Sequence, residues 1–220
     1  MTRKGVARIA LVSSLAIAGL GMAVGVSPAA AKAKKKTVTK TATFNQCVAV
    51  SSPIIDPDDG VGPASAAIGV TVPNFKGGVQ DGLVTSVASV GVRIDHTYAG
   101  DLQIVLISPG GKVVPLSLGR GSSADGFGTG AGNCGGTLAL FGNTGSPIAD
   151  ANPDGNDDPL VGPFTPEQPL AALAGGPARG AWVLLVTDKS SSDEGTLEAL
   201  SLNFTYSYKA QVKAKKKKKK

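Results

Sequence analysis

The chain has few of the residues that catalysis usually requires. Among 220 residues it contains one histidine, His96, two cysteines and one tryptophan. A serine-protease triad needs a histidine that reaches both a serine and an acid, and no Gly-Thr-Ser-type nucleophile loop accompanies His96. We therefore expect no enzyme in this chain. For His96 we expect a structural role, packed and hydrogen-bonded at the end of a strand.

Basic residues are scarce in the middle of the chain. Residues 41–208 hold six of them against all sixteen acidic residues, a formal charge of −10. This distribution excludes a uniformly basic nucleic-acid-binding domain, although the whole chain has a net charge of +6. Lysine runs either keep a chain soluble or act as interaction tails. The lysines of the two ends are Lys32, Lys34, Lys35, Lys36 and Lys40, then Lys209, Lys213 and Lys215–Lys220.

The N-terminus has the pattern of a secretory signal peptide over residues 1–31. Arg3, Lys4 and Arg8 precede an apolar stretch from Ile9 to Val26, and Pro28-Ala29-Ala30-Ala31 offers small residues for cleavage. A membrane anchor is the alternative interpretation. No later segment has the apolar length that a spanning helix needs. We expect a secreted protein with no transmembrane segment in the mature chain.

Helix-favouring runs are absent, whereas strand patterns recur. Leu200 to Tyr208 alternates apolar and polar residues with a period of two, which is typical of a half-buried strand. The pattern predicts one all-β sandwich with long loops at residues 119–136 and 142–168. Further strands are expected at Val90–Asp95, Leu102–Ile107 and Trp182–Val186, in a hairpin from Leu102–Ser108 through Pro109-Gly110-Gly111 to Lys112–Leu118, and less clearly at Ala64–Val72 and Thr37–Phe44.

Two blocks of sequence resemble the P domain (P/Homo B domain) that follows the catalytic domain of proprotein convertases and many bacterial subtilisin-like proteases. The resemblance covers roughly residues 65–206 in the order and spacing of that family. The first block is His96-Thr97-Tyr98-Ala99-Gly100-Asp101-Leu102 leading to Ser108-Pro109-Gly110-Gly111. The second is Pro169-Leu170 to Gly175, then Gly180-Ala181-Trp182, Thr187-Asp188, Gly195-Thr196-Leu197 and Leu200-Ser201-Leu202.

The resemblance implies a jelly-roll-like β-sandwich that is associated with serine-type endopeptidases and proteolysis but is not itself catalytic. In convertases such a domain packs on the protease and influences its calcium and pH dependence. We expect a sandwich over residues 44–208 between lysine-rich segments at 32–43 and 209–220. Two functions follow. One is a secreted binding or stabilising module for a separately encoded subtilisin-like protease. The other is a structural or adhesion protein held to an anionic cell-envelope polymer by its lysines.

Cys47 and Cys134 are the only cysteines. Export would place them in oxidising surroundings, so we expect a disulfide that ties the N-terminal segment to the Gly-rich insert, Gly119 to Gly136. The bridge also argues against a cysteine-protease site. Free thiols or an intermolecular link are the alternatives.

Calcium is the one cofactor that the acidic residues suggest, because it prefers carboxylate and carbonyl oxygens on loops. Asp150, Asn152, Asp154 and Asn156 have spacing like the start of a calcium loop, but Val161 stands where an EF-hand has glutamate. The alternative is a solvated turn, which these residue types also favour. Two further candidate sites are Asp56, Asp58 and Asp59, and the pair Asp101 and Asp188 at strand ends.

Overall fold

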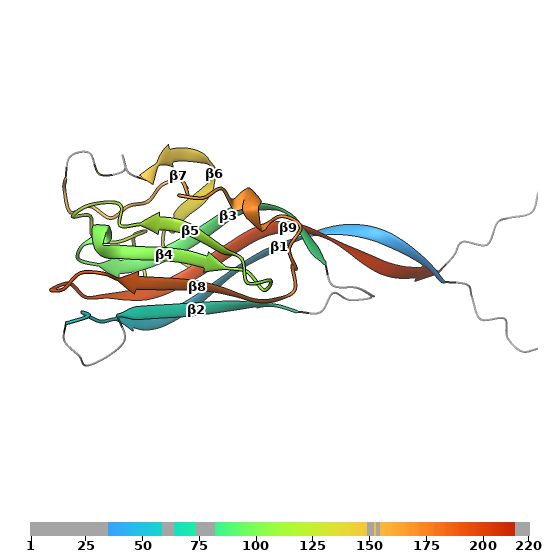
Figure 1. The fold of residues 1–220 in the computed structure, drawn as a ribbon, viewed down its shortest axis with the longest axis horizontal. Helices are drawn as coiled ribbons and strands as arrows, with labels where there is room; N and C mark the ends of the chain where they lie inside the picture. Colours follow the sequence, from blue (N-terminus) through green and yellow to red (C-terminus); the bar gives the residue numbers. More distant parts are fainter. Residues whose placement is uncertain (1–34, 59–63, 74–81, 149–151, 153–154, 214–220) are drawn as a thin grey trace, which may run out of the picture. The chain divides into compact units, whose positions relative to one another are not determined.

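The computed structural model describes residues 35–58, 64–73, 82–148, 152 and 155–213 (Figure 1). The chain divides into Met1–Ala33 and Lys34–Lys220, and every described residue belongs to the second unit. The predicted signal peptide and Lys215–Lys220 lie outside the described residues. Within the described ranges, no helix is long and apolar enough to cross a membrane.

Two sheets face each other in a β-sandwich, which confirms the predicted fold class. The five-stranded sheet has the order β1-β9-β3-β6-β7 and the four-stranded sheet the order β2-β8-β4-β5. All pairs are antiparallel except β6 with β7. The elements are β1 Lys35–Ile54, β2 Ser65–Val72, β3 Leu83–His96, η1 Ala99–Asp101, β4 Leu102–Ile107, β5 Val113–Leu118, β6 Ala139–Pro147, β7 Phe164–Thr165, η3 Leu170–Leu173, β8 Gly180–Asp188 and β9 Gly195–Lys213.

The period-two pattern of the sequence is realised in β9. Leu200, Leu202 and Phe204 are fully buried, while the intervening polar residues are only partly covered. Alternate residues of a strand point to opposite faces of the sheet, so one face of β9 enters the core. The other predicted strands match observed ones to within one residue: Leu102–Ile107 coincides with β4, while Ala64, Ser108 and Lys112 fall just outside their strands.

The predicted hairpin between β4 and β5 is present, and its turn explains the Ser-Pro-Gly-Gly motif. The Ser108 backbone nitrogen donates to the Lys112 carbonyl oxygen (2.9 Å), and the Gly111 nitrogen donates to the Ser108 carbonyl oxygen (2.9 Å). The Ser108 hydroxyl accepts from the Lys112 nitrogen at 3.1 Å. Gly111 has φ of 77°, a conformation that favours glycine.

The long loop predicted at residues 142–168 is wrong in part. β6 continues to Pro147, and β7 occupies Phe164–Thr165 within the same segment. Gly142, Gly145 and Pro147 read as loop residues because glycine and proline weaken strands. Tertiary contacts override this local preference: the Asn143 amide donates to the Val87 carbonyl oxygen at 3.1 Å, which holds β6 beside β3.

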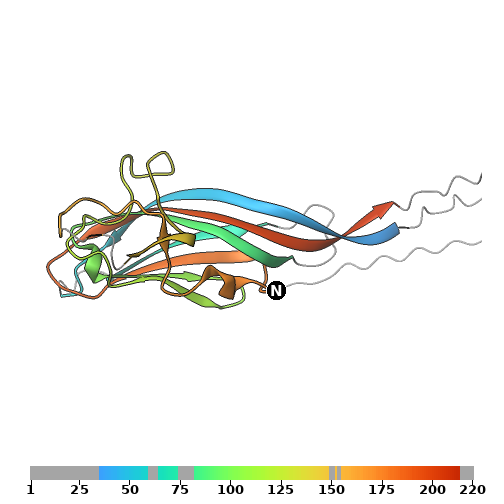
Figure 2. The same ribbon diagram turned by 90° about the horizontal axis from the view of Figure 1, so that it is seen from above.

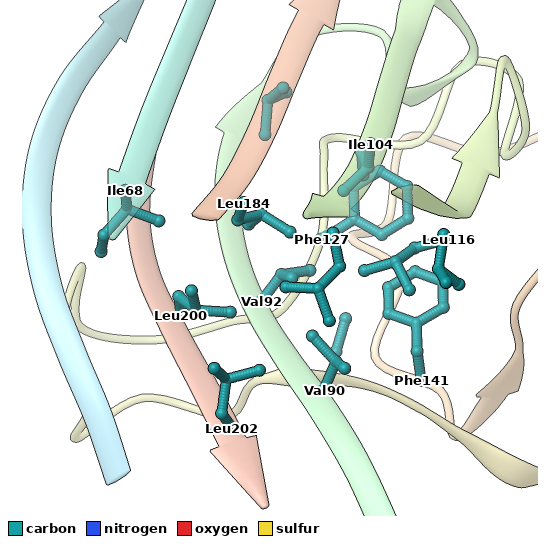
Figure 3. Close-up of a cluster of buried hydrophobic side chains, with 14 of the residues drawn as sticks. Ile68, Val90, Val92, Ile104, Leu116, Phe127, Phe141, Leu184, Leu200 and Leu202 are labelled. Carbon is teal, nitrogen blue, oxygen red and sulfur yellow. The ribbon is translucent and has the colours of Figure 1, made fainter. Parts of the chain in front are cut away.

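The core lies between the two sheets (Figure 3). Val90 and Val92 of β3 point across the sandwich towards Ile104 of β4, and Phe127 and Phe141 fill the space between them. Each such side chain stabilises the fold by roughly 1.5–3 kcal/mol when fully buried. The core therefore joins strands from both sheets to the Gly-rich insert that contains Phe127.

Beyond the sandwich, β1 and β9 continue as a two-stranded ribbon (Figure 2). β3 pairs with β9 only from His96↔Gly195 to Leu83↔Ser207, whereas β1 pairs with it as far as Lys35↔Lys213. We call residues 35–40 and 208–213 the lysine ribbon. These strands continue into the segments that the sequence assigned to lysine-rich flanks of the domain.

Candidate functional site

The two motif blocks meet at one end of the sandwich. His96 is the last residue of β3 and pairs with Gly195, the first residue of β9. Asp188 is the last residue of β8 and pairs with Leu102, the first residue of β4. Residues about ninety positions apart in the sequence are thus placed side by side where their strands end.

A buried hydrogen bond links His96 to Asp188. The His96 Nε2 atom lies 3.2 Å from Asp188 Oδ2, and both side chains are 0 % exposed. His96 Nδ1 lies 3.0 Å from the Tyr98 carbonyl oxygen and 3.2 Å from the Tyr98 backbone nitrogen. With the proton on Nε2, the ring donates to Asp188 while Nδ1 accepts from the Tyr98 N–H.

Asp188 is satisfied on both carboxylate oxygens. Its Oδ1 accepts from the Ser190 backbone nitrogen at 3.1 Å, while its Oδ2 faces His96. Buried polar groups need such partners, since an unpaired one costs about 1–3 kcal/mol. The arrangement fits the structural role predicted for His96, because the ring has both nitrogens engaged and no access to solvent.

The glycine of the second block has a steric reason to be there. A Cβ atom at Gly195 would collide with the Asp95 carbonyl oxygen and lie 2.6 Å from the His96 ring. Any larger residue would push the start of β9 away from the end of β3. Gly195 therefore allows the close approach that keeps His96 beside Asp188.

An outer group of polar residues surrounds this pair. The Thr97 hydroxyl donates to Asp193 Oδ1 at 2.6 Å, and the Lys189 nitrogen donates to the Asp101 carbonyl oxygen at 3.1 Å. Burial raises the pKa of Asp101, and the nearby carboxylates of Asp188 and Asp193 raise it further, while a hydrogen bond from Ser190 opposes them. The structure thus brings Asp101 and Asp188 together, as the sequence proposed, and adds Asp193 and Ser190, which sequence reasoning missed.

The Asp56 carboxylate caps backbone groups. Its Oδ1 accepts from the Asp58 nitrogen (2.8 Å) and its Oδ2 from the Ser192 nitrogen (2.6 Å). This contact fastens the end of β1 to the loop that follows β8. Asp59 lies outside the described residues.

The second predicted calcium loop is described only in part, because Asp150 and Asp154 lie outside the described residues. The Asn152 amide donates to the carbonyl oxygens of Gly121 (3.1 Å) and Asn156 (3.0 Å). Asn156 donates to Asp158 Oδ2 at 3.0 Å. In the described part of the chain, no three His, Cys, Asp or Glu side chains form a metal-binding group. Calcium at any of the three places stays a prediction.

The disulfide between Cys47 and Cys134 is confirmed, with an S–S distance of 2.03 Å. It joins β1 to the Gly-rich insert across a sequence separation of 87 residues. Closing a loop of this length stabilises the fold by about 4–5 kcal/mol in the chain-entropy model.

The Gly-rich insert also packs against β3. Phe127 and Ile94 exchange backbone hydrogen bonds of 2.7 and 2.9 Å. Gly126 has φ of 76°, and a Cβ atom there would strike the Ile94 carbonyl oxygen. Next to it, Arg93 is only 8 % exposed and its Nε lies 3.2 Å from Glu198 Oε2. The insert is therefore an ordered part of the sandwich.

Comparison with known proteins supports the identification of the motifs. The family model described as the proprotein convertase P-domain matches residues 85–131, which confirms the resemblance and includes His96 to Gly111. The second motif block, Gly180 to Leu202, lies outside the matched residues. P domains are non-catalytic accessory domains of subtilisin-like proteases. No curated protein matches the chain.

Solved structures of a bacterial protease are similar to the chain at low identity. The complex of Aeromonas sobria serine protease with the chaperone ORF2 has 20% identity and a TM-score of 0.42, covering 76% of this chain. The serine protease of the same organism has 17% identity and a TM-score of 0.34, covering 80% of this chain. The chain spans 27% of the length of each.

Proposed function

We propose that this protein is a secreted, non-catalytic P-domain module that binds and stabilises a subtilisin-like protease. The observation that carries the proposal is the P-domain match over residues 85–131. Its His96 is fixed by Asp188 from the second motif block. The match itself indicates a domain of the kind that accompanies proteases. The partner and the mode of action are our inference.

The state of His96 supports a binding role over a catalytic one. A general base must reach the proton that it removes, but the His96 side chain is 0 % exposed and bonded to Asp188 and Tyr98. The ring ties the end of β3 to the end of β8. In this arrangement the histidine holds loops in place for a partner and does no chemistry itself.

Secretion is part of the proposal, and the disulfide supports it. Disulfides persist in oxidising compartments and are rare in the cytosol, and Cys47 and Cys134 are joined. Tethering β1 to the Gly-rich insert would keep the module folded outside the cell, where a secreted protease acts.

Affinity capture tests the proposal with the full chain as bait among secreted proteins at physiological salt, with and without calcium. We expect a subtilisin-like protease to be enriched and labelled by a serine-hydrolase probe, while the bait stays unlabelled. Labelling of the bait that is lost in His96→Ala would overturn the non-catalytic assignment. Failure to retain any serine hydrolase would overturn the protease partnership. A calcium dependence of capture would support the predicted calcium sites.

A further inference from the structure

The lysine ribbon concentrates positive charge without any acidic residue. Its five lysines, Lys35, Lys36, Lys40, Lys209 and Lys213, are all exposed. The nearest acidic residues in the sequence are Asp56 on the β1 side and Glu198 on the β9 side. Two segments from opposite ends of the chain therefore form one cationic surface, which the sequence alone presented as two separate lysine runs.

The pairing register places lysines and neutral polar side chains on one face. Lys35 is opposite Lys213, Thr37 is opposite Gln211, and Thr39 is opposite Lys209. Residues directly opposite each other in an antiparallel pair share a face, with Cβ atoms about 4.5–5.5 Å apart. All six side chains are exposed, so this face combines three ammonium groups with hydroxyl and amide groups that can hydrogen-bond an anion.

The opposite face of the ribbon carries two more lysines beside apolar side chains, of which Ala210 is buried. Lys36 is opposite Val212, and Lys40 is opposite Tyr208.

Like charges directly across a strand pair, such as Lys35 and Lys213, destabilise the pair. An anion bound between them would relieve this repulsion, which gives the free ribbon an electrostatic reason to take up a partner.

The shape and composition of the ribbon favour a linear partner over a membrane. A bilayer is planar and can meet only one face, whereas a polymer chain can follow both faces of a two-stranded ribbon. Surface-seeking membrane segments also insert large apolar side chains. The exposed large apolar side chains of the described residues lie elsewhere: Leu83, Tyr98, Val113, Leu118, Leu140 and Val161.

We propose that the lysine ribbon is the binding site for a linear anionic polymer with closely repeating charges. This inference goes beyond the protease-binding function and does not depend on it. The ribbon forms the Lys213 end of β9, whereas His96 and Asp188 lie at its Gly195 end. The two functions can therefore be lost separately.

The test compares two full-length variants with the same net charge, using long-chain inorganic polyphosphate as the probe. The ribbon variant changes Lys35, Lys36, Lys40, Lys209 and Lys213 to glutamine. The matched control changes Lys216–Lys220 to glutamine. For the ribbon variant we expect the slope of log K against log salt to weaken by about 4, since each neutralised phosphate of a nucleic acid contributes about 0.7–0.9. For the control we expect a smaller change.

Three outcomes would overturn the proposal. One is an equal or larger weakening of the salt slope in the matched control, which would assign binding to the number of lysines at the C-terminus and not to the ribbon. The others are an unchanged salt slope in the ribbon variant, and tighter binding of the unmodified chain to anionic vesicles than to polyphosphate at equal charge concentration. Unchanged thermal melting of the ribbon variant excludes unfolding as the cause of lost binding. If the variant melts at a lower temperature, amide exchange of the unmodified chain is the test instead. Slower exchange of residues 35–40 and 208–213 after polyphosphate is added would support the proposal, and unchanged exchange would overturn it.

Discussion

The two halves of β9 follow the same alternating pattern in different surroundings. From Gly195 to Ser207 the strand lies between β1 and β3, whereas from Tyr208 to Lys213 it pairs with β1 alone among the described residues. The outward residues change accordingly, from Ser201 and Asn203 to Lys209 and Lys213. In both halves the apolar side of the strand is the less exposed one, as the buried Ala210 shows for the ribbon, while the choice of polar residue depends on what a face meets.

The largest expected effect is a difference in how much the two parts of β9 contribute to the stability of the fold. Phe204→Ala should destabilise the fold by about 3–5 kcal/mol, because it removes a fully buried ring that contacts both Trp182 and Phe44. Val212→Ala in the lysine ribbon should cost less than about 1 kcal/mol, since Val212 is only partly buried there. Chemical denaturation of both variants measures the difference. Equal losses would mean that the ribbon carries as much folding energy as the sandwich.

The His96 end gives the next largest expected effect. His96→Ala should destabilise the fold by about 1–3 kcal/mol, because Asp188 Oδ2 would lose its buried partner. Asp188→Asn keeps the shape of that side chain but replaces one of its two accepting oxygens with a donor, so it should destabilise the fold too. A double-mutant cycle by thermal or urea unfolding isolates the pair. Additive losses would contradict the hydrogen bond as the link between β3 and β8.

Local pattern was enough to predict most of the strands, because period-two alternation depends only on one buried face. β6 escaped prediction because Gly142, Gly145 and Pro147 look like loop residues and are held by contacts with β3 and β7. A strand at Thr37–Phe44 was predicted only weakly, and its pairing with the C-terminal lysine segment was not predicted, because the two segments lie at opposite ends of the chain. No local signal can reveal a register between residues 35 and 213.

The sequence could predict which residues belong to the site, but not which of them contact one another. Resemblance to P domains pointed to His96, Asp101 and Asp188, yet the His96–Asp188 bond spans 92 positions and required the fold to be known. Asp193 had no motif to mark it, and its partner Thr97 is 96 positions away. Such contacts depend on which strand ends meet, and that is a property of sheet order.

The smallest expected effect comes from Asp101, in the acidic group around His96, at the opposite end of β9 from the lysine ribbon. Burial and two neighbouring carboxylates raise the pKa of Asp101 above its usual 3.8. The folded state therefore binds the Asp101 proton more tightly than the unfolded state does, and the ionised carboxylate opposes folding. Asp101→Asn should accordingly increase stability at neutral pH.

This stabilisation should be present in full above the raised pKa of Asp101 and fade as the pH falls towards and below 3.8, because the carboxyl group is then protonated in both states. Melting temperatures of the two proteins across that pH range measure the effect. Added salt should reduce the part that comes from the partly exposed Asp193 more than the part that comes from the buried Asp188, since salt screens buried charges much less. A stabilisation that stayed constant from neutral pH to below 3.8 would contradict charge repulsion as its cause. The gain would then come from hydrogen bonding by the new amide, and the His96 end would not be under electrostatic strain.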